Sequence, residues 1–321
     1  MAKKVLVTEY IHPSGVEMLE QEVEVVRPSD ISVAGMKEAI ADVDGVLVRV
    51  APVNREVIAA ATRLKVIGKH GVGTDNIDIP AATERGIAVC NTPEANSEGV
   101  ASLAFAMMLA LSRKLLGCDA FVRQGGNWKG KERFTGSELL GKTLSIVGTG
   151  RIGSRLAQMC QAAFDMKVYA YDPYVSAEAM AARGITKVET VDELMPIADF
   201  VSIHSPLTPA TRGIVSTKQF GLMKKTAFLI NAARGPVVDE AALIAALQSG
   251  EIAGAGLDVF EDEPPAADNP LLKMENVILA PHIGGGTDES MERMATHAAA
   301  DILAVLRGER PKYLMNREVW K

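Results

Sequence analysis

The chain has 321 residues, which is too long for one ordinary hydrophobic core and therefore favours two domains. Hydrophobic residues make up 48% of the chain and charged residues 23%, a composition typical of a folded globular protein and not of a disordered one. The formal net charge of −6 argues against a nucleic-acid-binding protein, which would carry a basic excess.

Cysteine usage and the N-terminal sequence indicate a cytoplasmic protein. Cys90, Cys118 and Cys160 form no C-x-x-C pair, and their odd number suits a reducing compartment. The chain begins MAKKVLVTEY, without the apolar stretch of a signal peptide. The most apolar run, Val100–Leu111, is too short to cross a bilayer.

The first part of the chain, up to Cys90, alternates apolar strand patterns with helical patterns and short loops. This alternation predicts a parallel sheet with helices on both faces. Strands are expected at Val5–Thr8, Val23–Val26, Gly45–Arg49, Leu64–Gly68 and Ile87–Cys90, and helices at Ser14–Gln21, from the N-cap Ser32 to Ala41, at Val53–Ala61 and at Ile79–Arg85. Because no G-x-G-x-x-G occurs here, this half is predicted to be a Rossmann-like domain that does not itself hold a dinucleotide.

A long apolar helix between Pro93 and Lys114, a second helix and the segment Gln124–Gly136 lead to the strongest motif, in Lys142–Asp172. There the strand Leu144–Val147 runs into Gly148-Thr149-Gly150-Arg151-Ile152-Gly153, followed by a helix with Ile152, Leu156, Met159 and Ala163 on one face and by the strand Lys167–Tyr171. Strand, G-x-G-x-x-G, helix, strand and acid form the dinucleotide-binding unit in its required order.

Each part of this motif has a physical role. Gly148 would allow the tight turn, Gly150 would let the backbone approach a pyrophosphate, and Gly153 would let the helix pack on the strand. The N-terminus of the helix would offer free N–H groups to the phosphates. Asp172 would bind both ribose hydroxyls and repel a 2′-phosphate, so NAD is favoured over NADP.

The alternation resumes after Asp172. Strands are expected at Phe200–His204, Ala227–Asn231, Gly254–Val259 and Val277–Ala280, and helices at Thr217–Leu222, Glu240–Gln248 and Ser290–Arg307. The last helix finds no sheet edge left in the second domain, so it is predicted to cross back and pack on the first. The predicted fold is α/β with two Rossmann-like domains: a flavodoxin-like substrate domain of residues 1–98 and 287–321, and an NAD-binding doubly wound parallel sheet of residues 99–286.

Three ionisable residues follow strand ends in the nucleotide-binding half: Arg234, Glu263 and His282. Ligands of open parallel sheets bind at these carboxyl edges, so the three side chains can converge. His282 is the natural general acid/base, Glu263 would orient its imidazole, and Arg234 would hold a carboxylate and a keto oxygen. Taken singly, each of these residues is more often structural than functional, Arg234 as an ion pair and Glu263 as a solvated loop residue.

No metal is expected, because the five histidines have no ligand spacing: His12, His70, His204, His282 and His297. His204 is interpreted as part of a loop whose backbone contacts the nucleotide.

The chain resembles the D-isomer-specific 2-hydroxyacid dehydrogenases in NAARGPVVDEAAL, GLDVFEDEPP, PHIGGGT, GTGRIG and YDP, and over almost its whole length. Within the family the closest resemblance is to the 3-phosphoglycerate dehydrogenases, through TDNIDIPAATERGIAVCNTP, RFTGSELLGKTL and ALQSGEIAGAGLDVFEDEPP. The resemblance implies that Arg234, Glu263 and His282 form the catalytic set. It also implies a homodimer formed through the nucleotide domain, with the Arg113–Gly136 region as an arm.

The same resemblance implies the ligand contacts. The cofactor set comprises Gly148, Gly150, Arg151, Ile152, Gly153, Asp172, His204, Ser205, Pro206, Ala232, Ala233, Arg234, Asp258, His282, Gly284 and Gly285. The substrate set comprises Arg49, Lys69, Val72, Gly73, Arg234 and His282, with the amides of Val72 and Gly73 holding the substrate carboxylate.

Two departures from the phosphoglycerate dehydrogenases stand out. The chain stops at Trp320-Lys321, so we expect a short form without their regulatory domain. It has Lys69-His70 where those enzymes commonly have an arginine, although Lys69 and Arg49 still supply positive charge for a phosphate, sulfonate or carboxylate.

The sequence therefore predicts an NAD-dependent dehydrogenase of a small D-2-hydroxy acid, with 3-phosphoglycerate of serine biosynthesis as the first candidate. A hydroxypyruvate, glyoxylate or other 2-oxoacid reductase, such as a sulfolactate dehydrogenase, is the alternative of the same class. An NAD(H)-sensing corepressor-like binding protein is the alternative of another class. Neither a nucleic acid nor a membrane is an expected partner.

Overall fold

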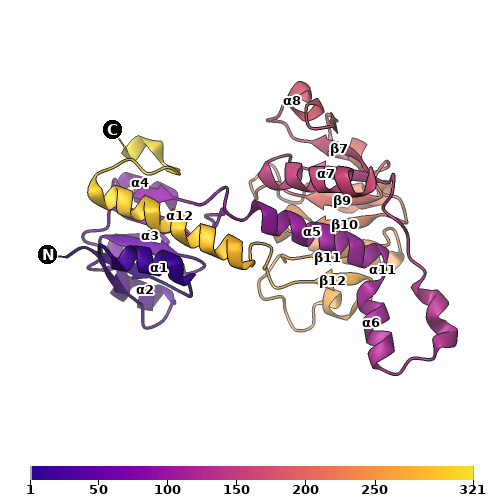
Figure 1. Ribbon diagram of the computed structural model, residues 1–321, viewed down its shortest axis with the longest axis horizontal. Helices are drawn as coiled ribbons and strands as arrows, with labels where there is room; N and C mark the ends of the chain where they lie inside the picture. Colours follow the sequence, from indigo (N-terminus) through magenta and orange to yellow (C-terminus); the bar gives the residue numbers. More distant parts are fainter. Residues whose placement is uncertain (1, 321) are drawn as a thin grey trace. The chain divides into compact units, whose positions relative to one another are not determined.

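The computed structural model describes residues 2–320, which form two compact units (Figure 1). One unit takes in the residues up to Ser97 together with those from Gly285 onward, and the other is Glu98–Gly284. The chain therefore leaves the first unit once and returns to it. The fold is α/β with two parallel sheets, as predicted.

The first unit contains a five-stranded parallel sheet in the order β2-β1-β3-β4-β5, the flavodoxin-like order. Its strands are β1 (Lys4–Val7), β2 (Glu24–Val26), β3 (Gly45–Val48), β4 (Val66–Lys69) and β5 (Ala88–Cys90). Its helices are α1 (Pro13–Glu20), α2 (Val33–Ile40), α3 (Arg55–Ala60), α4 (Ile79–Glu84), α12 (Asp288–Arg307) and the 3₁₀ turn η4 (Arg317–Val319). As predicted, Ser32 caps α2, accepting a hydrogen bond from the Gly35 amide at 3.2 Å.

Side chains of the first sheet alternate between two helical layers. Leu6, Val46 and Ile67 pack in a core formed with α2, α3 and α4, whereas Val5 and Leu47 pack on α1 and α12. The strands are therefore apolar on both faces, which explains why their sequences read as short continuous apolar runs.

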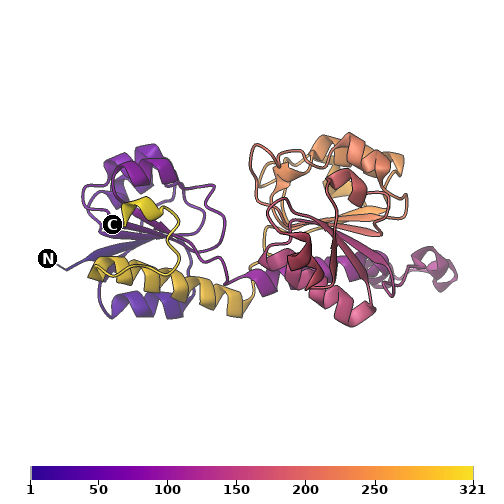
Figure 2. The same cartoon turned by 90° about the horizontal axis from the view of Figure 1, so that it is seen from above.

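The C-terminal helix packs on the first sheet, as predicted from its unpaired apolar face (Figure 2, yellow helix). Against α1 it comes so close that a Cβ on Gly15 would lie 2.7 Å from the backbone of Ala295. The segment that follows α12 is held to the first sheet by Asn316. The side chain of Asn316 accepts from the Val89 amide at 2.8 Å and donates to the Ile87 carbonyl at 2.9 Å.

The second unit contains a seven-stranded parallel sheet in the order β12-β11-β10-β9-β6-β7-β8, a doubly wound sheet whose order reverses between β6 and β9. Its strands are β6 (Thr143–Val147), β7 (Lys167–Tyr171), β8 (Ile185–Lys187), β9 (Phe200–Ile203), β10 (Phe228–Asn231), β11 (Gly254–Leu257) and β12 (Val277–Leu279). The helices covering it are α5 (Ser97–Ser112), α7 (Arg151–Phe164), α8 (Ala177–Ala181), α9 (Val191–Leu194), α10 (Thr217–Leu222) and α11 (Glu240–Ser249), with 3₁₀ turns η2 (Gly235–Val237) and η3 (Pro270–Lys273).

The buried face of α7 agrees with the predicted one except at its C-terminal end. Ala163 is exposed, and the buried residues are Gly153, Leu156, Ala157 and Cys160. The face is rotated toward Gly153 because this glycine must pack directly on the Gly148 carbonyl, which a Cβ would approach to 2.2 Å. The predicted face is thus confirmed at Leu156, which is buried, and at Ile152 and Met159, which are partly buried against the same core, and it is wrong at Ala163.

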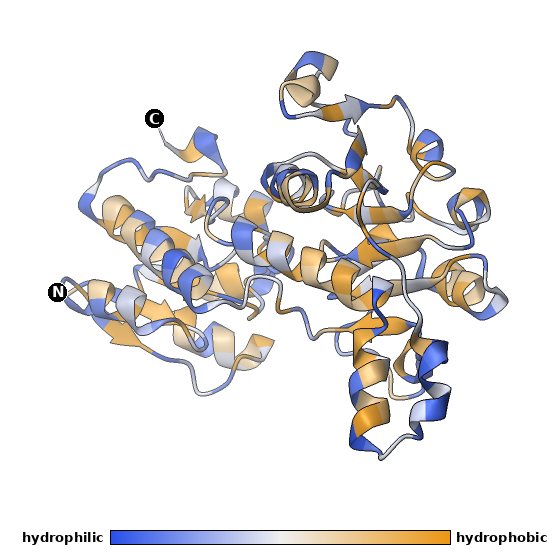
Figure 3. Cartoon of the chain, turned by 45° about the vertical axis from the view of Figure 1, so that its right-hand side comes forward, coloured by the Kyte–Doolittle hydropathy of each residue, from blue (hydrophilic) through white to orange (hydrophobic). Residues whose placement is uncertain are grey.

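The helix α6 (Leu115–Arg123) and the 3₁₀ turn η1 (Trp128–Phe134) have no buried residues. Figure 3 shows hydrophobic and hydrophilic residues along this part of the chain. Their large apolar side chains are exposed, including Leu115 at 58%, Val122 at 57% and Trp128 at 69%. Pairing of two chains through this arm stays a prediction. Among the described residues no single helix is long and apolar enough to span a membrane, although α5 and α6 taken together, bent by 62°, meet the same test of length and composition.

Candidate active site

The glycine-rich turn joins β6 to α7 at the point where the strand order of the second sheet reverses. Gly148 has φ of +94°, and a Cβ there would lie 2.9 Å from the backbone of His204 and Ser205, so the turn requires glycine. His204 and Ser205 follow β9, the neighbour of β6 across the reversal. The turn therefore lies where open parallel sheets bind nucleotides.

The residues around this turn fit a dinucleotide. The helix α7 begins after Gly150 without any side-chain cap, and a Cβ on Gly150 would have no atom within 4 Å. Because this end of the helix has no side-chain cap and the space beside Gly150 is open, a pyrophosphate can approach it. The buried Nδ1 atom of His204 and Oγ atom of Ser205 have no hydrogen-bond partner within the described part of the chain. Burial lowers the pKa of His204 to about 4, so its ring is neutral at pH 7.

Asp172 directly follows β7 and is 9% exposed. Its Oδ2 atom accepts hydrogen bonds from the Thr149 amide at 2.8 Å and the Thr149 hydroxyl at 3.2 Å, and its Oδ1 atom accepts from the Tyr174 amide at 3.0 Å. The carboxylate is therefore fixed against the glycine-rich turn. Oδ2 already accepts twice, so Oδ1 is the oxygen that keeps a further lone pair with which a ribose hydroxyl can interact.

Glu263 and His282, which are 19 positions apart in the sequence, form a hydrogen-bonded pair with 2.7 Å between Nδ1 of the imidazole and Oε2 of the carboxylate. Both are partly solvent-accessible, with 49% of the His282 side chain and 38% of the Glu263 side chain exposed. Burial alone would raise the pKa of the Glu263 carboxyl, but His282, the Phe260 amide and the charge of Arg234 together lower it. Glu263 is therefore ionised at neutral pH and can only accept, so Nδ1 of His282 carries the proton.

Asp258 holds the backbone that carries His282. Its carboxylate accepts from the amides of Ile283 and Gly284, both at 2.7 Å, and its carbonyl accepts from the His282 amide at 2.9 Å. This fixes His282 at φ of +54°, a left-handed conformation that non-glycine residues rarely adopt. Burial raises the pKa of the Asp258 carboxyl, opposed by its two amide donors. The structure thus places Asp258 behind the imidazole as its backbone support.

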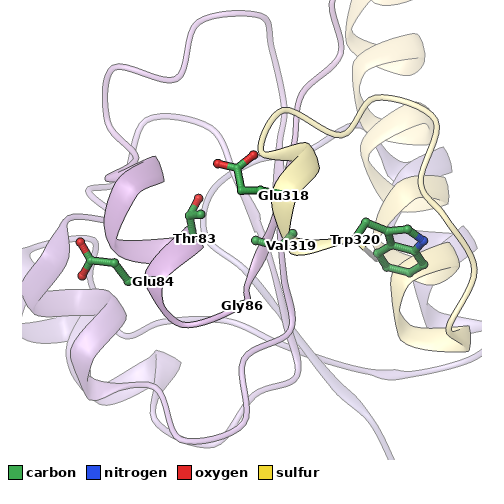
Figure 4. Close-up of a pocket in the computed structure, with 6 residues that line it drawn as sticks. All are labelled: Thr83, Glu84, Gly86, Glu318, Val319 and Trp320. Atoms are coloured by element: carbon green, nitrogen blue, oxygen red, sulfur yellow. The ribbon is translucent and has the colours of Figure 1, made fainter.

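Two hollows of the structure are candidate sites. The larger, about 660 Å³, lies in the first unit and is lined by Thr83, Glu84, Gly86, Glu318, Val319 and Trp320 (Figure 4). It contains no predicted site residue, and its acids Glu84 and Glu318 would repel an acidic substrate. The smaller, about 400 Å³, lies in the second unit beside Glu263 and His282 and has apolar walls that include Phe260, Leu272 and Leu279. The polar pair in an apolar hollow makes this the candidate reaction site.

The other predicted cofactor residues of the second unit also follow strand ends at the same edge. Ser205 and Pro206 follow β9; Ala232, Ala233 and Arg234 follow β10; Asp258 follows β11; and His282 and Gly284 follow β12. Arg234 donates to the Ala233 carbonyl at 2.7 Å. Gly285 instead belongs to the first unit, where a Cβ on it would lie 3.2 Å from the Asn96 side chain, so its contact with the cofactor stays a prediction.

The predicted substrate residues of the first unit lie at the carboxyl edge of its sheet. Arg49 follows β3, and the amides of Val72 and Gly73 donate no hydrogen bond to any described residue, which leaves them available to an anion. Lys69 ends β4 but is only 8% exposed, and its ammonium donates to the Arg49 carbonyl and, at 2.7 Å, to Oδ1 of Asn76. The predicted contact of Lys69 with substrate therefore competes with bonds inside the unit.

Sequence reasoning missed Glu9 and Asn76, which contact the Arg49 segment. Glu9 follows β1 at the same edge of the sheet. The strand-end argument used for the second half could have found it.

Among residues 2–320 no three His, Cys, Asp or Glu side chains are grouped so that they could hold a metal ion. The strand order, the glycine-rich turn and the unsatisfied groups beside it define the second unit as a dinucleotide-binding Rossmann domain.

Comparison with known proteins identifies the family. Residues 105–284 match the NAD-binding domain of the D-isomer specific 2-hydroxyacid dehydrogenases. The chain is 45% identical over 314 residues to D-3-phosphoglycerate dehydrogenase of Methanocaldococcus jannaschii, across 98% of this chain and 59% of that protein. It is 43% identical over 329 residues to glyoxylate reductase of Thermococcus litoralis, across 99% of this chain and 98% of that protein.

Among solved structures, D-lactate dehydrogenase from Aquifex aeolicus, complexed with NAD and lactic acid, has a TM-score of 0.85 and 33% identity, across 95% of this chain and 96% of that one. The protein belongs to the D-isomer specific 2-hydroxyacid dehydrogenase family. It spans about three fifths of the length of the phosphoglycerate dehydrogenase it resembles.

Proposed function

We propose that the protein is an NAD-dependent dehydrogenase that interconverts a small D-2-hydroxy acid and its 2-oxo acid. The observation that carries this proposal is the hydrogen-bonded Glu263–His282 pair at the carboxyl edge of a dinucleotide-binding sheet. Bound NAD would supply or accept the hydride, and the protein must move the hydroxyl proton and hold the acid.

His282 is proposed to move that proton at Nε2. The ionised Glu263 holds the proton of Nδ1, which leaves Nε2 as the ring nitrogen that exchanges a proton with the substrate oxygen. The carboxylate also stabilises the doubly protonated ring that protonates a carbonyl. Arg234 is proposed to bind the substrate carboxylate and keto oxygen with its planar fork, and the Val72 and Gly73 amides to hold the carboxylate.

The first candidate substrate is 3-phosphoglycerate, with phosphohydroxypyruvate as its 2-oxo acid. It is supported by relatives named D-3-phosphoglycerate dehydrogenase and by the cationic Arg49 at the edge of the first sheet. Glyoxylate or hydroxypyruvate is the second candidate, because a relative named glyoxylate reductase is matched across 98% of its length. The NAD(H)-sensing alternative is less well supported, since a sensor does not need the Glu263–His282 pair.

NADH oxidation with phosphohydroxypyruvate, hydroxypyruvate, glyoxylate, sulfopyruvate and 2-oxoglutarate, each in turn, tests the function. We expect turnover of at least one acid and the highest kcat/KM for phosphohydroxypyruvate, because Arg49 can pair with its distal phosphate. Preference for glyoxylate would retain the reaction and reject the substrate. If none of the five acids is turned over although NADH still binds, the dehydrogenase proposal is rejected and the NAD(H)-sensing alternative is favoured.

We also propose that Asp172 makes the enzyme prefer NAD to NADP. Asp172→Asn retains an oxygen that can accept from Thr149 but removes the charge that repels a 2′-phosphate. We expect the ratio of kcat/KM for NADH over NADPH to fall about tenfold or more, the factor that corresponds to roughly 1.4 kcal/mol. Asp268→Asn, at an exposed loop acid, is the matched control. An unchanged ratio in Asp172→Asn would assign the discrimination to another residue.

A further inference from the structure

The backbone segment Arg49–Ala51 is held by one carboxylate through three consecutive amides. Oε2 of Glu9 accepts from the Arg49 amide at 2.9 Å, and Oε1 accepts from the Val50 amide at 2.7 Å and the Ala51 amide at 2.5 Å. Bonds from an ionised acceptor to backbone N–H groups are the stronger kind of protein hydrogen bond. Glu9 therefore holds the backbone N–H groups of this segment in place.

The carbonyl side of the same segment is held by Lys69 and Asn76. The Lys69 ammonium donates to the Arg49 carbonyl, and the Asn76 amide donates to the Ala51 carbonyl at 2.7 Å. Lys69 also donates to Oδ1 of Asn76 at 2.7 Å, which joins the two side chains to each other. Glu9, Lys69 and Asn76 together form what we call the Arg49 clamp.

The clamp lies at the place in the first unit where a ligand is expected. In the order β2-β1-β3-β4-β5 the connections reverse between β1 and β3, and the crevice at that point is the usual ligand site of such sheets. Glu9 follows β1 and Arg49 follows β3, so they flank the reversal. Arg49 therefore belongs to a backbone segment whose N–H groups and carbonyls are both held in place, at the edge of the sheet where a ligand is expected.

We propose that Glu9, Lys69 and Asn76 are positioning residues that preset Arg49 to bind the anionic substrate, and that Lys69 is not itself a substrate ligand. This inference rests on the proposed function, because it needs a 2-oxo acid bound by Arg49. A buried ammonium with two acceptors would have to give up those bonds to reach a substrate, whereas in place it keeps the Arg49 segment ordered.

A double-mutant cycle with Lys69→Met, Glu9→Gln and Arg49→Met tests this proposal in the intact chain. We expect each single variant to raise KM for the 2-oxo acid about tenfold, while kcat and the Kd for NADH stay within about twofold. In the Arg49→Met background, Lys69→Met or Glu9→Gln should add less than about twofold, because residues that act through Arg49 lose their effect once its charge is gone. Lys65→Met, at an exposed lysine beside the same strand, is the matched control.

A different outcome of the double-mutant cycle is expected if Lys69 is a substrate ligand. If Lys69 binds substrate directly, the effects of Lys69→Met and Arg49→Met on KM multiply. Multiplied effects would overturn the assignment of Lys69 as a positioning residue. If Lys69→Met does not fold, Glu9→Gln still tests the Arg49 clamp, because Glu9 holds the amides on the other side of the segment.

Amide hydrogen exchange separates failure of the clamp from failure of the function. Without any substrate, Glu9→Gln should speed exchange at the amides of residues 49–51 by about tenfold or more, because their acceptor is weakened. Unchanged exchange would overturn the clamp. A wild-type chain that turns over none of the tested acids, with the expected exchange, would overturn the proposed function instead.

Discussion

His282→Ala should lower kcat by roughly 10²–10⁴-fold, the usual contribution of a general acid/base, while the Kd for NADH changes by less than about twofold. The variant removes the imidazole, whose Nδ1 proton is held by Glu263 at 2.7 Å and whose Nε2 is proposed to exchange the substrate proton. Steady-state turnover and NADH binding by fluorescence measure the two quantities separately. Unchanged turnover would remove His282 from the reaction.

Two companion variants control for backbone effects. Because His282 has φ of +54°, alanine adds strain there, whereas asparagine tolerates the left-handed conformation well. His282→Asn should therefore show the same loss of kcat as His282→Ala with a more native-like melting temperature. His12→Asn, which keeps an acceptor at the start of α1, should leave turnover unchanged.

Much of the second unit could be predicted because its chemistry follows strand ends. Glu263 and His282 are far apart in the sequence, but they follow β11 and β12, which are neighbours in a parallel sheet. Once a parallel sheet is inferred from alternating patterns, side chains after adjacent strands must lie at one edge. The same reasoning identified the C-terminal helix as a layer of the first sheet, since its apolar face had no other partner.

Three short elements of the second unit were not predicted, because their sequences carry little apolar pattern. The helix α8, the strand β8 and the helix α9 have five, three and four residues, too few to show either helical or strand periodicity. They are defined by pairing with β7 and by packing of Met180 and Leu194 into the two cores. These are long-range contacts that no local window contains.

The arrangement of Lys69 could not be predicted because its partners are set by the fold. From the sequence, a lysine after a strand in a substrate loop indicates a ligand for an anion. In the structure its acceptors are the Arg49 carbonyl, which belongs to the neighbouring strand end, and the Asn76 side chain. The sequence shows that Lys69 carries a positive charge, but it does not show which acceptors the folded chain places beside the ammonium.

Gly150→Ala should weaken NADH binding by about 10–100-fold without destabilising the protein. Gly150 has φ of −63°, which alanine adopts freely, and a Cβ there would have no atom within 4 Å. The added methyl therefore meets no other atom of the protein, but it stands where the backbone is expected to approach the pyrophosphate at the start of α7. NADH titration gives the affinity, and thermal unfolding without cofactor gives the stability.

The choice of Gly150 separates cofactor binding from folding. Gly148→Ala would remove both, because φ of +94° and a Cβ 2.9 Å from the backbone of His204 strain the turn itself. Gly221→Ala in α10 is the matched control, since a Cβ there also has no atom within 4 Å and the helix lies apart from the glycine-rich turn in sequence. Wild-type affinity in Gly150→Ala would mean that the pyrophosphate does not approach this turn, and the open space at the start of α7 would then need another occupant.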